Sequence, residues 1–164
     1  MATEIISPLM PLTQSVDQAQ TTIPLFQTLG VLLSMYARHK QYDTQTIGQW
    51  LGRVMPFLNH HQARLFITEG KTPYGFASWV EVPEAVHQQL LKDATWVCVE
   101  PQLAQLLSRR LENNQPYYLW FIDLLTPFGH ALAATKDLKQ RLSNHQSAWA
   151  LNINQGQRGP RRVW

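Results

Sequence analysis

The sequence predicts a mixed α/β or α+β fold, in which a central sheet is flanked by helices within a single domain. Three observations predict this class. Apolar residues recur at helical spacing in the N-terminal part, two short strands with a glycine turn follow, and residues 117–124 form a continuous apolar run. Such a run is typical of a central strand buried on both faces. The 164 residues, 45% apolar and 15% charged, suffice for one compact core.

The N-terminal part predicts an arm followed by two helices. Residues 1–24 mix prolines with Ser, Thr and Gln, so we expect a loosely held segment there. A helix over residues 25–38 follows from the spacing of Leu29, Leu32, Leu33 and Tyr36. A second helix, capped by Asp43 or Thr44 and ending near Asn59, follows from an apolar side made of Ile47, Trp50, Leu51, Val54 and Leu58.

The next segment predicts a β-hairpin and a third helix. Strands over residues 62–68 and 74–82 flank a turn that contains Gly70. Pro83 suits the first turn of a helix, because its missing N–H needs no partner there. We expect that helix to run to about Lys92.

The C-terminal half predicts strands that alternate with helices. A short strand over 96–99 and a helix over 102–111 precede the central strand 117–124, which Thr126-Pro127-Phe128-Gly129 closes. A helix over 131–142 and a last strand over 148–153 complete the fold. Because residues 156–162 are rich in glycine and arginine, we expect them to be loose. The predicted boundaries are therefore an arm at 1–24, a domain at 25–154 and a basic tail at 155–164.

Charge and cysteine content narrow the classes of partner and site. The net charge is only +3, but six basic residues against one acid, Asp137, follow residue 135. This segment is either a solvated tail or a surface for an acidic partner. The single Cys98 excludes a disulfide framework and a cysteine-rich zinc site, and no metal site is expected. Without a signal peptide or a long apolar run, we expect a soluble cytoplasmic protein with no nucleic-acid partner.

Two segments carry a resemblance to a known family. Residues 119–129, Leu-Trp-Phe-Ile-Asp-Leu-Leu-Thr-Pro-Phe-Gly, resemble the signature of the lysine acyltransferases that activate RTX protoxins, with Thr126 in place of alanine. Residues 73–79, Pro-Tyr-Gly-Phe-Ala-Ser-Trp, are similar to that family's strand ending in Ala-Ser-Trp. Upstream, His39-Lys40-Gln41-Tyr42 resembles the element that carries the family's catalytic histidine.

The resemblance implies a fold similar to the GNAT acyltransferases and a catalytic pair of His39 and Asp123. The chemistry agrees, because a lysine ammonium with a pKa near ~10.4 must lose a proton before it attacks a thioester. Histidine suits that task, and a carboxylate can hold its tautomer and stabilise its cation. The same motifs offer candidates for contact with substrate, although aromatic residues of this kind more often belong to a core: Ser78, Trp79, Trp120, Phe128 and Gly129.

Other catalytic constellations find less support in the sequence. Cys98 reads as a small apolar residue in a buried strand rather than as a nucleophile. His60 and His61 are adjacent in sequence and have no third metal ligand nearby. Ser78 lacks the Gly-x-Ser-x-Gly context of a hydrolase.

The resemblance implies acyl-carrier protein as the donor and a lysine-containing polypeptide as the acceptor. Acyl-CoA is less favoured, because no glycine-rich turn opens a helix to hold a pyrophosphate. Arg158, Arg161 and Arg162 are candidates for contact with an acidic carrier. Two alternatives stay open: acylation of lysine or ornithine in a ribosomal peptide, and an inactive binding module with this fold. The acyl chain length and the oligomeric state, a homodimer included, also stay open.

Overall fold

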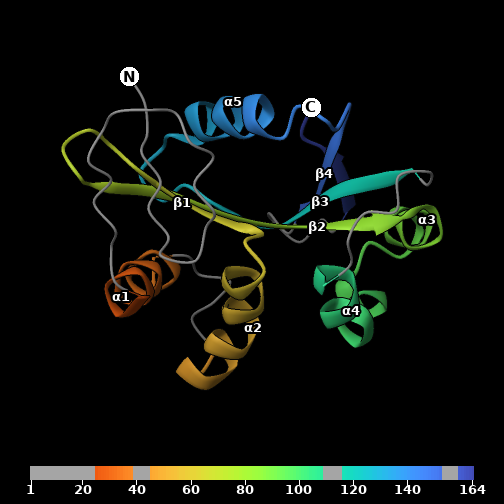
Figure 1. Cartoon of the computed structure of the whole chain (residues 1–164), viewed down its shortest axis with the longest axis horizontal. Coiled ribbons are helices and arrows are strands. Elements are labelled where there is room, and N and C mark those ends of the chain that lie inside the picture. The colour runs from red at the N-terminus through yellow and green to blue at the C-terminus, as the bar shows by residue number, and fades with distance from the viewer. Residues whose placement is uncertain (1–24, 39–44, 109–115, 153–158) are drawn as a thin grey trace. The chain divides into compact units, whose positions relative to one another are not determined.

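The computed structural model describes residues 25–38, 45–108, 116–152 and 159–164. It confirms a mixed α/β fold with one mixed sheet and flanking helices (Figure 1). The elements are α1 (Leu25–Tyr36), α2 (Ile47–Asn59), β1 (Ala63–Ile67), β2 (Pro73–Pro83), α3 (Glu84–Asp93), η2 (Trp96–Cys98), η3 (Glu100–Gln102), α4 (Leu103–Ser108), β3 (Tyr117–Leu125), α5 (Ala131–Arg141), β4 (Ala148–Asn152) and β5 (Gly159–Arg162). Within these ranges no helix has the length and hydrophobicity that crossing a bilayer requires.

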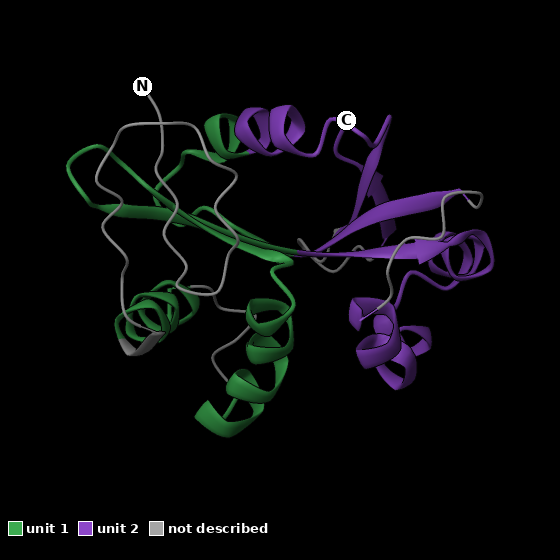
Figure 2. Ribbon diagram, in the orientation of Figure 1, with its two compact units in different colours: residues 1–78, 123–134 green, residues 79–122, 135–164 purple. Residues whose placement is uncertain are grey.

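The five strands lie in sequence order, from β1 to β5, so β3 occupies the centre as its apolar run predicted. The chain divides into two compact units, residues 1–78 with 123–134 and residues 79–122 with 135–164 (Figure 2). Strands β2 and β3 each contribute residues to both units. The units are therefore described one after the other.

In the first unit, a capping box starts α2. The Thr46 hydroxyl accepts the backbone N–H of Gln49 at 3.2 Å, and the Gln49 side chain accepts the backbone N–H of Thr46 at 2.9 Å. Two N–H groups that a helix start would leave open are thereby satisfied. The predicted caps Asp43 and Thr44 were wrong, since this pair sets the helix start. Ile47 is exposed, whereas we expected it on the buried side, and the side chains that α2 buries are Trp50, Val54, Phe57 and Leu58.

The predicted hairpin forms the sheet of the first unit. Strands β1 and β2 pair antiparallel, with Leu65 opposite Phe76. Helices α1 and α2 lie on one side of these strands (Figure 1). Gly75 brings backbones close together, because a β-carbon there would lie 3.1 Å from the Leu125 carbonyl oxygen and 3.2 Å from Phe66. Only glycine therefore fits at this point of β2 without displacing its neighbours.

The second unit contains the parallel part of the sheet. Strands β3 and β4 pair parallel, with Trp120 opposite Trp149, and α5 connects them. Strand β4 also pairs antiparallel with β5, where Leu151 lies opposite Pro160. The prediction that residues 156–162 are loose was wrong for 159–162. An edge strand tolerates Pro160 because one of its sides needs no ladder hydrogen bonds, and residues 153–158 lie outside the described part of the chain.

The predicted strand at residues 96–99 is instead the 3₁₀-helix η2. The Thr95 side chain accepts the backbone N–H of Val97, so the backbone gains a local partner in place of a neighbouring strand. Val97 is 66% exposed, which a buried strand would not permit. The following helix is confirmed as α4, which ends at Ser108 within the described residues.

An aromatic cluster around His87 fills one side of the second unit. The His87 ring stacks on Tyr118 at 3.8 Å between centroids and also contacts Trp149. The indole N–H of Trp120 donates to His87 Nδ1 at 3.0 Å, which places the ring proton on Nε2. Burial lowers the pKa of His87, although the nearby Glu84 carboxylate opposes this. The folded protein therefore holds this imidazole in its neutral form.

A matched pair of glycine substitutions tests the packing of the first unit. We expect Gly75→Ala to lower the unfolding free energy by about 1–3 kcal/mol, because the added carbon overpacks the site between β2 and the end of β3. Gly52→Ala in α2 meets no atom within 4 Å and should raise stability by about 1 kcal/mol. Chemical denaturation of both variants measures the difference. Equal effects of the two substitutions would contradict the close approach at Gly75.

Acid should destabilise the protein through His87. Because the folded-state pKa is lowered, the unfolded chain takes up the proton first as the pH falls below 6.5, and the folded state loses stability there. Stability contributed by the neutral ring is fully present above that pH. We expect the acid-induced fall in Tm between pH 7 and pH 5 to become shallower in His87→Gln, whose amide oxygen can still accept from Trp120. An identical slope in both proteins would exclude His87 as the titrating group.

Candidate functional site

The carboxylate of Asp123 is the centre of the candidate site. It lies in β3 near the strand's end, is 3% exposed, and belongs to the first unit. Burying a charge is costly unless partners replace the lost water. Two partners come from other elements: the Arg53 guanidinium forms an ion pair with Oδ1, and the Ser78 hydroxyl donates to Oδ2 at 3.0 Å. Both oxygens of Asp123 are therefore held.

Arg53 reaches Asp123 from the middle of α2. It follows the buried Trp50 by three residues and precedes the buried Phe57 by four, so it lies beside the apolar side of the helix. Its guanidinium lies 6.0 Å from the centre of the Tyr36 ring, and Tyr36 in turn packs edge-on against Trp50 at 5.6 Å. The Arg53 side chain keeps 28% of its surface exposed. In this ion pair, the Asp123 carboxylate is thus buried, while the Arg53 side chain is partly exposed to solvent.

Ser78 belongs to the same constellation through β2. Its side chain is buried among apolar neighbours on that strand, where a hydroxyl needs a hydrogen-bond partner. Asp123 supplies it. The Ser78 hydroxyl therefore acts as a hydrogen-bond donor to Asp123. An ionised carboxylate has about four lone-pair sites, so it can accept more than one donor.

The turn after β3 carries the residues that the sequence placed next to the site. The backbone N–H of Gly129 donates to the Thr126 carbonyl at 3.1 Å, and Gly129 has a φ of 88°, which glycine adopts without strain. Phe128 is 48% exposed, and the Arg38 guanidinium lies 5.2 Å from its ring centre. Arg38 directly precedes His39 in the sequence. The chain segment that leads to His39 therefore contacts the turn that follows Asp123.

The structure brings together only some of the predicted site residues. His39 and Arg158 lie outside the described residues. Asp123 and Ser78 form one hydrogen-bonded group in the first unit, while Phe128 and Gly129 occupy an exposed turn of that unit. Trp79 and Trp120 belong to the second unit and are buried. Arg161 and Arg162 are exposed on β5 of the second unit.

Arg53 is the partner of Asp123 that the sequence interpretation missed. A signal for it exists in the sequence, because Arg53 is the sole charged residue in the segment 47–59 and stands next to its apolar positions. The partner expected for Asp123 was His39, whereas the partner in the described residues of α2 is Arg53. The pairing joins residues 70 positions apart, which helical spacing alone cannot reveal.

Cys98 has the properties of an unreactive thiol. Burial raises its pKa, and its Sγ lies 3.9 Å from the Thr95 carbonyl oxygen, to which it donates. A nucleophilic cysteine needs the thiolate, which a raised pKa disfavours at neutral pH. The predicted buried strand around Cys98 was wrong, so the support for an unreactive thiol comes from the raised pKa and not from that strand. Over the described ranges, no group of three or more His, Cys, Asp or Glu side chains could hold a metal ion.

Comparison with known proteins identifies the class to which this fold and site belong. The model of the RTX toxin acyltransferase family matches residues 21–164, and the chain is a member of that family. Asp123 and its partners therefore lie in an acyltransferase. The chain is 24% identical over 125 residues to the lysine-acyltransferase RtxC of Vibrio cholerae, covering 74% of this chain and 72% of that protein. It is 23% identical over 127 residues to the uncharacterized protein sll0720 of Synechocystis, covering 77% and 79% of the two chains.

Removing Arg53 should lower the unfolding free energy, because the buried carboxylate of Asp123 loses its ion pair. In Arg53→Met the aliphatic part of the side chain is kept, but Asp123 loses its cationic partner, so we expect a loss of about 2–3 kcal/mol in unfolding free energy. The matched control is Arg141→Met, which breaks the exposed pair with Asp137 at 3.2 Å and should cost at most about 0.5 kcal/mol. Denaturant titration of both variants gives the comparison. Losses of the same size would mean that the Arg53 pair contributes no more than a surface pair.

Proposed function

We propose that this acyltransferase moves a fatty acyl group from acyl-carrier protein to the side-chain amine of a lysine in a partner polypeptide of the protoxin type. The observation that supports this most is the buried, doubly held carboxylate of Asp123 within the family's signature strand. A charge kept at such cost indicates a role that an apolar residue could not fill. The similarity to a protein named as a lysine-acyltransferase supports lysine as the acceptor.

In the proposed reaction, His39 acts as the general base. The lysine ammonium first releases one proton to solvent, and His39 accepts the second proton from the nitrogen as the neutral amine attacks the thioester carbonyl. The new C–N bond forms and the C–S bond breaks, so an amide results. The imidazolium then protonates the departing thiolate of the carrier's pantetheine arm, which returns His39 to its neutral form. No external oxidant or metal is required to balance these steps.

Asp123 is proposed to act through His39. A carboxylate that accepts from one ring nitrogen fixes the tautomer and stabilises the imidazolium that forms during transfer. Arg53 and Ser78 restrict the orientation of the carboxylate, since they hold different oxygens. The contact of Arg38 with Phe128 supports the assignment, because it joins the residue next to His39 to the turn that follows Asp123, within one unit.

Intact-mass measurement tests the reaction directly. The purified protein is incubated with a lysine-containing acceptor polypeptide and acyl-carrier protein charged with a fatty acid. We expect one fatty-acyl increment per modified lysine, located by fragmentation. Acylation from acyl-CoA but not from the charged carrier would overturn the donor assignment, and absence of any product from every donor would overturn the acyltransferase mechanism proposed for His39 and Asp123.

Replacing the proposed base should abolish transfer without unfolding the protein. We expect His39→Ala to lower the rate at least about 100-fold, which is the usual contribution of a general base. His60→Ala serves as the matched control, because this exposed histidine lies at the end of α2 and has no proposed role. Cys98→Ser should also keep most of the activity. Initial rates and melting curves of all three variants test whether His39 is the base and whether the variants stay folded. More than about a tenth of wild-type activity in His39→Ala would rule out the base assignment.

A further inference from the structure

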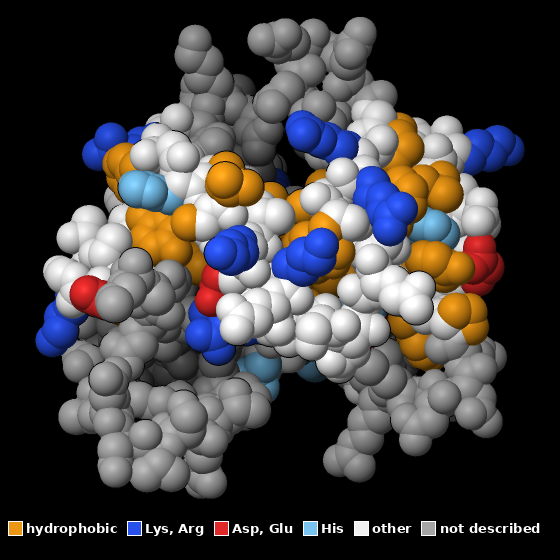
Figure 3. Space-filling model, turned by 90° about the horizontal axis from the view of Figure 1, so that it is seen from above, with side chains coloured by type: hydrophobic (Ala, Val, Ile, Leu, Met, Phe, Trp, Pro, Cys, Tyr) orange, Lys and Arg blue, Asp and Glu red, His pale blue; other side chains and the backbone are white. Residues whose placement is uncertain are grey.

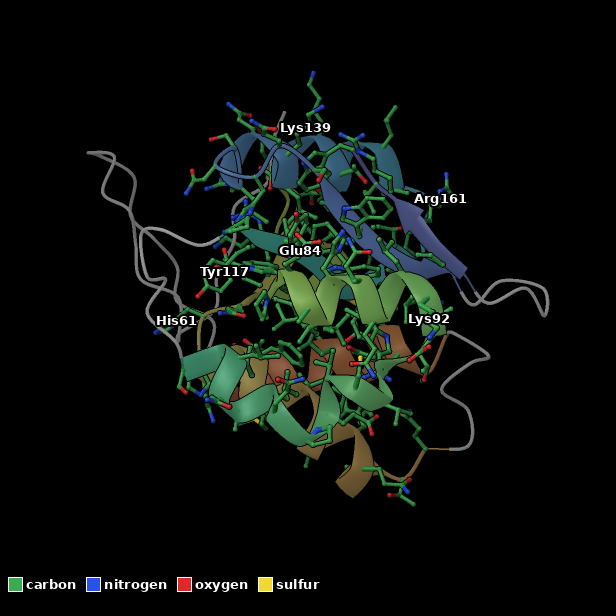
Figure 4. The ribbon with its side chains drawn as sticks, turned by 90° about the vertical axis from the view of Figure 1, so that its right-hand side faces the viewer. His61, Glu84, Lys92, Tyr117, Lys139 and Arg161 are labelled. Atoms are coloured by element: carbon green, nitrogen blue, oxygen red, sulfur yellow. The ribbon has the colours of Figure 1, made fainter. Side chains whose placement is uncertain are left out.

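The side of the second unit that α5 covers carries a concentration of positive charge. Figure 3 views the molecule from above and shows Lys and Arg side chains spread over this face. Lys139 and Arg161, from α5 and β5, both lie on the α5 side of this unit, whereas Lys92 lies on α3 (Figure 4). We call this surface the basic face and define it by its exposed basic residues: Lys136, Lys139, Arg141 and Arg161.

Little negative charge balances the basic face. From residue 135 to the end of the chain the sequence contains one acidic residue, Asp137. That carboxylate is engaged by Arg141 at 3.2 Å, one helical turn away. Lys136 and Lys139 remain as like charges on neighbouring turns of the helix, an arrangement that does not stabilise it. The segment from residue 135 onward, which supplies the basic face, therefore carries a net positive charge.

Structural roles account for only part of this charge. Basic residues in the last turn of a helix interact favourably with its dipole, which suits Lys139 and Arg141. Charged residues on an edge strand hinder unwanted strand pairing, which suits β5, and Arg162 Nε donates to the Trp164 carbonyl at 2.8 Å. Neither role requires Lys136.

We propose that the basic face is the docking surface for the acidic acyl-carrier protein that delivers the fatty acyl thioester. This inference rests on the donor in the proposed function. The thioester sits at the end of a flexible pantetheine arm, so the carrier can dock on a face that contains no catalytic residue. The acceptor differs, because the polypeptide around its lysine has to bind directly at the site of Asp123. Complementary charge speeds encounter and selects the partner.

The test compares two double variants with the same change in net charge. Lys139→Gln/Arg161→Gln removes charge from the basic face, while Lys71→Gln/Lys92→Gln removes it from the β1–β2 turn and from α3. Affinity for the unacylated holo carrier is measured by fluorescence anisotropy at low and high salt. We expect about a tenfold loss of affinity for the first variant at low salt and a smaller loss at high salt, with wild-type affinity for the second.

Kinetics separate docking from chemistry. The first variant should show a raised KM for the charged carrier, with kcat at saturation, KM for the acceptor and the rate with acyl-pantetheine unchanged. The docking face would be overturned if the first variant kept wild-type affinity for the carrier, or if both variants lost the same affinity. A raised KM for the acceptor, in place of a raised KM for the carrier, would overturn it too. Binding to vesicles that contain anionic lipid is measured for the same variants. If the first variant lost vesicle binding but kept its affinity for the carrier, the docking face for the carrier would also be overturned. A wild-type protein that binds the carrier but makes no product from its thioester would instead refute the proposed donor.

Discussion

The need to compensate one buried carboxylate organises the first unit. Asp123 lies in a strand whose neighbours are apolar, and an ion taken out of water costs several kcal/mol unless charged or polar partners replace the solvent. The compensation comes from α2 through Arg53 and from β2 through Ser78. The position of α2 therefore matters to the site, and so do the features that fix it: the capping box at Thr46 and the edge-on contact of Trp50 with Tyr36. The same ring of Tyr36 lies beside the Arg53 guanidinium.

Much of the fold follows from patterns within single segments. The helices α1, α2, α3 and α5, the hairpin and the central strand were predicted with ends within a few residues, because apolar periodicity and the turn at Gly70 are local signals. Besides the cap of α2 and the side of Ile47, two predicted segments failed because another interaction determined the structure. Around Trp96 a threonine cap competed with strand formation, and at Gly159–Arg162 pairing with β4 ordered a segment whose composition predicts a loop. Strand pairing depends on a partner elsewhere in the chain, which composition does not encode.

In the candidate site, too, local motifs were predicted from the sequence, whereas contacts between distant segments were not. The motif around residues 119–129 led to Asp123, and burial in β3 confirmed that the carboxylate needs a partner. The identity of that partner, Arg53, came only from the packing of α2. The family of the chain was correctly recognised from two motifs, and the match over residues 21–164 confirms it. The catalytic role of His39 stays a prediction, and its strongest support is the contact between Arg38 and Phe128, which joins the sequence neighbour of His39 to the turn after Asp123.

We propose that catalysis requires Asp123 as a buried anion and that the ion pair with Arg53 stabilises this anion in the folded protein. A double-mutant cycle tests it most directly, with unfolding free energy and kcat measured for Arg53→Met, Asp123→Asn and the combined variant. We expect the combined variant to be more stable than Arg53→Met alone, because it lacks the buried negative charge that Arg53 balances, while its kcat stays as low as that of Asp123→Asn. Stability losses that simply add, or activity that returns in the combined variant, would contradict it.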